Sequence, residues 1–198
     1  MNSDKTLSYY NTNAKEFTES TVNVDFTETQ NKFLSKVGAG ASILDFGCGS
    51  GRDTKYFLEK GYLVEAIDGS EELCKIASEY TGITVKKMFF QDLQEVKKYD
   101  AIWACSSILH LSYQELVVVT KKTAVALKDG GLLYTSFKYG EFEGMRNGRY
   151  FTDMTEEKLV KLLEDVEGFV AEEMWITSDV RKGRGEEKWL NLFLRKKS

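Results

Sequence analysis

The chain has 198 residues, of which 42% are hydrophobic and 29% are charged, and its formal net charge is −4. This length and composition fit one soluble globular domain that is large enough for a full sheet with helices on both faces. The acidic balance argues against a general nucleic-acid binder, so no DNA partner is expected, and no apolar run reaches the length needed to span a membrane.

The first half of the chain is expected to alternate helices with strands. Helices are predicted over 6–20, 25–36 and 52–59, and from the Ser70 cap onward, where Glu71 and Glu72 follow. Strands are predicted up to Leu44 and over 63–68, 85–91 and 99–106. The last of these is almost wholly apolar, which favours a central position in a parallel sheet.

The second half adds one more strand and then changes character. A helix over 113–127 is stopped by Asp129-Gly130-Gly131, and a strand follows over 132–138. Residues 139–153 are rich in glycine and charge and are predicted to form a long loop. A Thr155-capped helix over 156–165 precedes two final strands, over 169–177 and 189–194, around a turn at 181–188.

This order predicts a doubly wound α/β fold. Alternating strands and helices favour a mostly parallel sheet, here of seven strands with helices on both faces, and the closing hairpin adds one antiparallel strand. No linker or repeat is visible, so we expect a single domain over 1–198. Its parts would be an N-terminal helical cap (1–37), a ligand-binding core (41–138), and a lid loop, helix and hairpin (139–198).

The most informative segment is 42–53, which reads SILDFGCGSGRD. Gly47, Gly49 and Gly51 alternate through a turn between a strand and a helix, where positive φ or a close ligand approach requires glycine. Such a loop predicts a nucleotide-type site at the carboxyl edge of the sheet. A dinucleotide fingerprint would need glycine at Arg52, and a phosphate-binding P-loop would need Lys-Ser/Thr after the last glycine, so both patterns fail.

With Asp45 ahead of the glycines, the pattern D-x-G-x-G-x-G resembles motif I of class I S-adenosylmethionine-dependent methyltransferases. The segment LKDGGLL at 127–133 resembles the later L-K-P-G-G segment of that family, with Asp129 in place of proline. The segment LSYYN at 7–11 is similar to small bacterial members near the tellurite-resistance and quinone-biosynthesis methyltransferases. The resemblance covers about residues 6–197 and implies a Rossmann-like fold with S-adenosylmethionine as cofactor.

Cofactor contacts are expected at three successive strand ends. Asp68 would accept both ribose hydroxyls, while Asp92 would face the adenine amino group and Leu93 would offer the ring its N–H. The resemblance assigns Arg52 to the methionine carboxylate and Tyr10 to closure over the cofactor, with ordinary helix roles as the alternatives. The expected cofactor-binding residues are Tyr10, Asp45, Gly47, Cys48, Gly49, Arg52, Asp68, Gly69, Ser70, Gln91, Asp92, Leu93, Cys105 and Ser106.

The methyl acceptor is expected beyond the fourth strand, beneath the loops that follow the fifth. His110 is the only histidine and suits a general base, although a packing role is the alternative. Basic side chains of the lid could recognise an anionic substrate by bidentate hydrogen bonds, unless neighbouring glutamates neutralise them. These lid residues are Lys138, Arg146, Arg149, Arg181, Lys182 and Arg184.

The rest of the composition narrows the chemistry. One histidine and three widely spaced cysteines predict no metal site, and the odd cysteine count suits a reducing cytosol. The polar first residues contain no signal-peptide core, which favours a cytoplasmic location.

The predicted function is methyl transfer from S-adenosylmethionine to a small-molecule acceptor by in-line displacement. Methylation of RNA or protein, and non-catalytic binding of S-adenosylmethionine, remain alternatives. A nicotinamide oxidoreductase is disfavoured by Arg52. Neither the acceptor nor the oligomeric state follows from the sequence.

Overall fold

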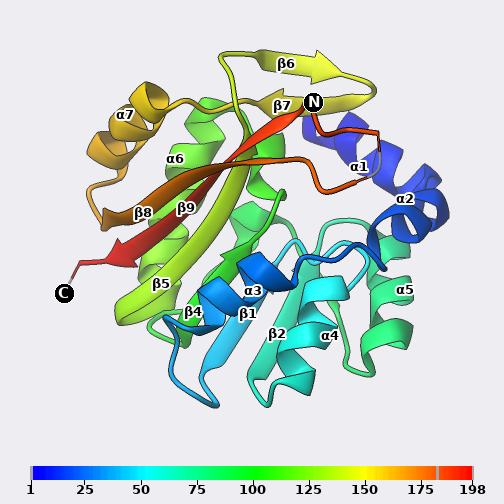
Figure 1. The fold of residues 1–198 in the computed structure, drawn as a ribbon, viewed down its shortest axis with the longest axis horizontal. Coiled ribbons are helices and arrows are strands. Elements are labelled where there is room, and N and C mark those ends of the chain that lie inside the picture. The colour runs from blue at the N-terminus through cyan, green and yellow to red at the C-terminus, as the bar shows by residue number, and fades with distance from the viewer. Residues whose placement is uncertain (1, 182, 198) are drawn as a thin grey trace.

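The computed structural model describes residues 2–181 and 183–197, so Lys182 of the predicted lid lies outside the described residues. Its centre is a sheet of seven strands in the order β3-β2-β1-β4-β5-β9-β8, beside a separate β6–β7 pair (Figure 1). The strands are β1 (Ser42–Phe46), β2 (Leu63–Asp68), β3 (Lys86–Lys87), β4 (Tyr99–Ala104), β5 (Leu127–Lys138), β6 (Glu143–Arg146), β7 (Arg149–Thr152), β8 (Phe169–Ser178) and β9 (Lys188–Lys196).

Helices cover both faces of this sheet (Figure 1). They are α1 (Asn2–Thr12), α2 (Ala14–Thr21), α3 (Thr27–Leu34), α4 (Arg52–Glu59), α5 (Glu71–Thr81), α6 (Tyr113–Ala126) and α7 (Glu156–Val166), with 3₁₀ turns η1 (Phe90–Asp92) and η2 (Ile108–His110). On one face, Phe33 of α3 and Phe57 of α4 pack against Trp103 of β4. On the other face, α6 and α7 pack over a second buried cluster.

The strand order confirms the predicted fold. β1 pairs in parallel with both β2 and β4, and β4 pairs in parallel with β5, whereas β9 runs antiparallel between β5 and β8. The chain therefore moves outward from β1 to β3 and then returns to the other side of β1 at β4. The switch point therefore lies between β1 and β4, which is where doubly wound sheets place a crevice for a ligand.

Two predicted elements in the first half are wrong in detail. The single helix over 6–20 is broken at Asn13, whose backbone (φ −109°, ψ 18°) is not helical and whose side-chain amide donates to the Tyr9 carbonyl at 2.8 Å. The strand over 85–91 shrinks to Lys86–Lys87, because the chain then turns into η1, where the Phe90 ring packs against Phe46 at 4.8 Å. Asp92 therefore ends a 3₁₀ turn and not a strand.

The predicted loop over 139–153 is also wrong, because most of it forms the β6–β7 hairpin. Its turn is Asn147–Gly148, with φ values of 51° and 78°. Positive φ at both central residues is what a two-residue hairpin turn requires, and Asn-Gly is its strongest sequence signal. The hairpin lies beside α1, where the Tyr150 N–H donates to Thr6 Oγ1 at 2.9 Å.

The fifth strand begins at Leu127 and not at 132, and α6 ends just before it at Ala126. Within residues 2–181 and 183–197, no helix is long and apolar enough to cross a membrane.

Candidate functional site

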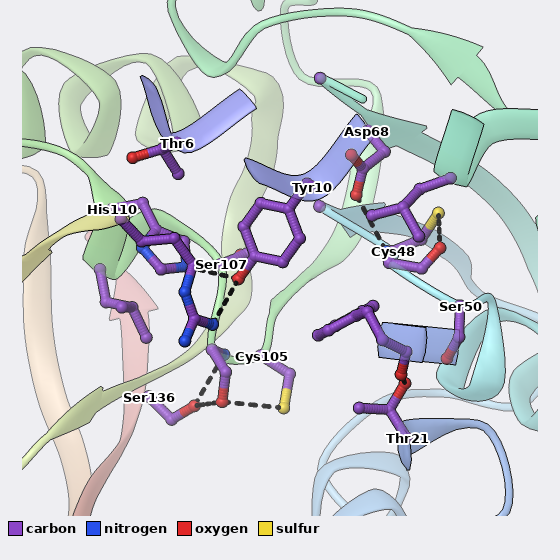
Figure 2. A pocket seen from close by; sticks show the side chains of 18 of the residues that line it. Thr6, Tyr10, Thr21, Cys48, Ser50, Asp68, Cys105, Ser107, His110 and Ser136 are labelled. Atoms are coloured by element: carbon purple, nitrogen blue, oxygen red, sulfur yellow. Dashed lines mark hydrogen bonds between the residues drawn. The ribbon is translucent and has the colours of Figure 1, made fainter. Parts of the chain in front are cut away.

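A cavity of about 500 Å³ opens at the carboxyl ends of β1, β2 and β4. Segments that are distant in the chain line it, including α1, the glycine loop, η1, η2, β7 and the chain between β8 and β9. Figure 2 shows side chains from α1, the glycine loop, the end of β2 and the exit of β4 around it. The predicted site residues that line the cavity are Tyr10, Gly47, Cys48, Gly49, Arg52, Asp68, Gly69, Gln91, Asp92, Cys105, Ser106, His110, Lys138, Arg149, Arg181 and Arg184.

The glycine loop is shaped first by its protein neighbours. A Cβ at Gly47 (φ 91°) would lie 2.5 Å from the Ser107 Cβ, and the Ser107 hydroxyl donates to the Phe46 carbonyl at 2.6 Å. Glycine is required here because the loop after β4 lies directly against it. The same contact fixes the relative position of the β1 and β4 exits, where the cavity opens.

Asp68 joins the glycine loop to the end of β2. Its Oδ2 accepts from the Gly49 N–H at 2.9 Å and its Oδ1 accepts from the Ser70 N–H at 2.8 Å. Burial raises the pKa of Asp68, against the effect of these backbone donors. A carboxylate has about four lone-pair sites, so each oxygen can still accept from a ligand hydroxyl in the cavity.

Ser70 lies behind this carboxylate and does not line the cavity. Its hydroxyl accepts from the Leu73 N–H at 3.2 Å, as the cap of α5, and donates to Asn11 Oδ1 at 2.7 Å. The predicted cap is confirmed. Its contact with α1 ties the N-terminal helix to the Asp68 end of the cavity.

Arg52 lies on the cavity wall but already has a carboxylate partner. Its Nε and Nη2 donate to Asp53 at 2.8 and 2.9 Å. Asp53 also accepts from Trp103 Nε1 at 2.9 Å and from Gln30 Nε2 at 2.7 Å. Burial alone would raise the pKa of Asp53, but the Arg52 guanidinium and these donors bring it below its usual range. The expected role of Arg52 toward a ligand carboxylate therefore competes with an internal ion pair.

Asp45 stands inside β1 and does not line the cavity. It accepts a 2.5 Å hydrogen bond from the Thr54 hydroxyl, which ties β1 to α4. Burial, together with the nearby charge of Asp53, raises the pKa of Asp45 to about 8. The acid that begins the glycine motif thus supports the loop from behind.

Of the cofactor residues expected at the third strand end, two line the cavity and one does not. Gln91 and Asp92 line the cavity beside Met88, Phe89 and Phe90. Leu93 is buried outside the lining, and its N–H is directed at the Phe90 carbonyl at 3.4 Å. Where the adenine ring was expected, the cavity is therefore lined mainly by the apolar side chains of 88–90, with the polar side chains of Gln91 and Asp92 beside them.

Three residues that were predicted separately form one cluster. The Tyr10 hydroxyl lies 2.8 Å from Nε2 of His110, and Arg149 Nη1 donates to the same hydroxyl at 3.4 Å (Figure 2). Nδ1 of His110 lies 2.6 Å from the Tyr150 carbonyl, which can only accept, so Nδ1 carries the proton. Nε2 is then the acceptor and Tyr10 is its donor.

Burial governs the titration of this cluster. It lowers the pKa of His110 to about 4, despite the opposing hydrogen bond to Tyr150, and it raises the pKa of Tyr10. At neutral pH the imidazole is therefore uncharged, and its Nε2 accepts the hydrogen bond from Tyr10. The arrangement places His110 behind the Tyr10 hydroxyl.

The exit of β4 contributes small polar groups. Ser106 has a positive φ of 50°, and its N–H donates to the Ser136 hydroxyl at 2.9 Å. Its own hydroxyl lies 3.3 Å from that of Ser136 and 3.9 Å from the Cys105 sulfur (Figure 2). Burial raises the pKa of Cys105 to about 12, so the thiol is protonated and is a poor nucleophile. Ser136 was missed, because a serine inside an apolar strand gives no separate sequence signal.

Most predicted lid cations have carboxylate partners. Arg181 donates to Asp179 at 2.9 and 2.5 Å, and Lys138 and Arg184 both pair with Glu187. Arg146 pairs with Asp153 at 2.7 Å and does not line the cavity. Among the described residues, Arg149 alone of these lid cations has no carboxylate within ion-pair distance. In the same part of the chain, no group of three or more His, Cys, Asp or Glu side chains could hold a metal ion.

Comparisons with known proteins agree with this geometry. Residues 43–131 match a protein family described as a methyltransferase domain. The chain is 32% identical over 110 residues to YqeM of Bacillus subtilis (strain 168), a protein with a provisional methyltransferase name. That match covers 50% of this chain and 44% of YqeM, so the chain spans less than half the length of this relative.

Solved structures share the fold. A 1,6-didemethyltoxoflavin-N1-methyltransferase of Burkholderia thailandensis, with S-adenosylhomocysteine bound, superposes with a TM-score of 0.76 at 21% identity, covering 100% of this chain and 87% of that one. A TehB-like S-adenosylmethionine-dependent methyltransferase of Corynebacterium glutamicum gives 0.71 at 18% identity, covering 96% and 98%. At these identities the likeness is one of fold.

Proposed function

We propose that this chain is a class I S-adenosylmethionine-dependent methyltransferase, which binds S-adenosylmethionine in the cavity and transfers its methyl group to a small-molecule acceptor; the methyltransferase-domain match, the relatives and the shared fold support this. The observation that carries the proposal is the hydrogen bond between Gly49 and Asp68. It brings the glycine loop and a carboxylate with free lone pairs to one end of the same cavity, as a nucleoside-type ligand requires.

The lining residues fit the parts of this cofactor. Asp68 would accept the ribose hydroxyls, and Gln91 and Asp92 would meet the edge of an adenine that lies against Phe89 and Phe90. Cys105 and Ser106 lie at the β4 exit, where the methionine part would pass. Tyr10 closes the cavity from α1. These assignments keep the sequence predictions for the cofactor site, while Asp45, Ser70 and Leu93 would support it from behind.

The bound cofactor supplies a methyl group on a sulfonium, which is already a good leaving group. With the cofactor bound, the acceptor atom would bond to the methyl carbon as the carbon–sulfur bond broke and left its electron pair on sulfur. The protein must align these atoms and exclude water. When the acceptor is a hydroxyl or an amine, its proton would pass to the Tyr10–His110 pair, whose imidazole is neutral at physiological pH.

Cavity size and composition support a small acceptor. A volume of about 500 Å³ holds a cofactor and a compact second molecule between α1 and the β6–β7 hairpin. The net charge of −4 disfavours RNA. The cysteines of the described chain are free thiols, which supports a reducing, cytoplasmic setting. We also propose that residues 1–198 act as one domain, with the cap, core and lid divided as the sequence suggests.

Methyl-labelled cofactor tests the proposal against its alternatives. The protein is incubated with S-adenosylmethionine carrying a tritiated methyl group and with a cell extract separated into small-molecule and macromolecular fractions. Label in the small-molecule fraction alone, lost with the Asp68→Asn variant, supports the proposal. Label confined to RNA or protein would move the acceptor to another class, and cofactor binding without any labelled product would indicate a non-catalytic binding protein.

A further inference from the structure

Arg149 is the one cavity-lining lid cation that has no counter-charge among the described residues. It begins β7, and its guanidinium lies over the rings of Tyr9 at 4.5 Å and Phe151 at 5.2 Å. Its Nε is buried without a hydrogen-bond partner, and its Nη1 makes only the long 3.4 Å bond to Tyr10. The aromatic rings hold the plane of the guanidinium and leave donors on its edge unpaired.

Of the carboxylates that line the cavity, Asp4 and Asp92 form no ion pair with Arg149, and the others bond to groups other than Arg149. Asp68 accepts from backbone N–H groups, Asp53 binds Arg52, and Asp179 binds Arg181. Glu115 accepts from the Ser112 N–H and hydroxyl as part of the α6 capping box. Glu187 is already shared by Lys138 and Arg184. Asp68 and Asp92 line the same cavity, but among the described residues no carboxylate lies within ion-pair distance of Arg149.

Arg149 is half-buried, and a charge held partly out of water without a counter-charge is costly unless a ligand supplies the opposite charge. We infer that the methyl acceptor is an anion, and that its carboxylate or other oxyanion group is bound by the guanidinium of Arg149. This inference rests on the proposed function, because it concerns the second molecule in the same cavity. A carboxylate fits best, since its two oxygens match the guanidinium fork.

The position of Arg149 also sets where the acceptor lies. The guanidinium is hydrogen-bonded to the Tyr10 hydroxyl that faces His110. An oxyanion on Arg149 would therefore place the rest of the acceptor beside this pair, on the lid side of the cavity. The anchor and the proton acceptor are thus neighbours, which fixes one molecule at two points.

Calorimetry with matched probes tests the inference without knowledge of the natural acceptor. Wild-type protein is first titrated with S-adenosylhomocysteine, and absence of binding at this stage would contradict the proposed function itself. The saturated protein is then titrated with benzoate, benzamide and phenyl phosphate. We expect benzoate to bind about tenfold or more tightly than benzamide, as a charge-assisted hydrogen-bonded pair predicts. Stronger binding of phenyl phosphate alone would also support an oxyanion site and identify the oxyanion as phosphate.

Two variants assign the effect to this guanidinium. Arg149→Met should remove the preference for the acid over the amide and leave the affinity for S-adenosylhomocysteine unchanged. Arg195→Met is the control, because it removes the same charge from a residue that pairs with Glu172 and does not line the cavity. If Arg149→Met does not fold, the binding of benzoate and benzamide is compared in Arg149→Lys and in the wild type instead. Equal binding of benzoate and benzamide, or loss of S-adenosylhomocysteine binding in Arg149→Met, would overturn the inference.

Discussion

The Tyr10 hydroxyl donates to Nε2 of His110 at 2.8 Å, although the two residues are 100 positions apart in the chain. This bond joins α1 to the 3₁₀ turn η2 after β4, and so connects the helical cap to the acceptor end of the cavity. In the structure His110 faces the cavity through Tyr10. Any proton that the imidazole receives from an acceptor would pass through this hydroxyl or require its displacement.

Replacing Tyr10 with phenylalanine tests this relation. The variant keeps the ring that packs at the edge of Phe17 but removes the donor to His110. We expect turnover to fall by at least about tenfold, in the range for loss of a general acid–base group, while affinity for S-adenosylhomocysteine stays unchanged. Turnover is measured on the acceptor found with labelled cofactor. Equal turnover in both proteins would show that Tyr10 only packs.

The free energy of unfolding should report the neutral state of His110. Its pKa is about 4 in the folded protein and roughly 6.5 in an unfolded chain. Between these values the unfolded chain binds a proton that the folded protein does not, so acid destabilises the fold. The loss begins as pH falls below about 6.5 and approaches about 3 kcal/mol near pH 4.

Other groups titrate in the same window, so the comparison is made with His110→Gln. Urea unfolding from pH 7.5 to pH 4.5 should show the stability of the wild type falling more steeply than that of the variant. The ¹⁵N resonances of the imidazole should also show a proton on Nδ1 and none on Nε2. A histidine that titrates near its ordinary pKa would contradict the burial of the imidazole, and a proton on Nε2 would contradict the tautomer.

Asp68→Asn should weaken cofactor binding without unfolding the protein. The amide keeps the shape of the side chain but replaces one acceptor oxygen with a donor, next to the N–H groups of Gly49 and Ser70. We expect the dissociation constant of S-adenosylhomocysteine to rise by about tenfold or more. Asp129→Asn is the control, because Asp129 is an exposed carboxylate that pairs with Lys97 and lies outside the cavity. Equal affinities in the two variants would remove Asp68 from the site.

The glycine loop gives a prediction about stability. An alanine at Gly47 would bring its Cβ to 2.5 Å from the Ser107 Cβ, whereas Gly61 has a similar φ of 84° with no atom within 4 Å. Gly61→Ala should cost only the strain of positive φ, about 1–2 kcal/mol. Gly47→Ala should cost at least about 2 kcal/mol more, because the contact must open. Urea midpoints of the two variants measure the difference. Equal midpoints would show that the loop after β4 can move away from residue 47 with no loss of stability.

The sequence was sufficient for the fold class, because apolar strands that alternate with helices predict a doubly wound sheet, and the glycine loop marked the edge at which the cavity opens; the strand order came from the structure. The β6–β7 hairpin was missed although Asn147-Gly148 carries its signal, because glycine and charge in the flanking residues favoured a loop. The break at Asn13 and the short β3 depend on tertiary packing, which local propensity does not describe.

The site was predicted residue by residue but not as a set of contacts. Arg52 was assigned to a ligand, yet the adjacent Asp53 takes its guanidinium. Asp45 was expected at the ligand and instead supports α4 through Thr54. The cluster of Tyr10, His110 and Arg149 joins three distant elements, so spacing along the chain could not reveal it.

The central claim is that the cavity beside the glycine loop and Asp68 is a site for S-adenosylmethionine. The most direct test is a calorimetric titration of the full chain with S-adenosylmethionine, S-adenosylhomocysteine and NAD. We expect one site per chain, with a micromolar-range dissociation constant for the first two ligands and no heat with NAD. Binding of NAD alone, or no binding of S-adenosylhomocysteine, would contradict it.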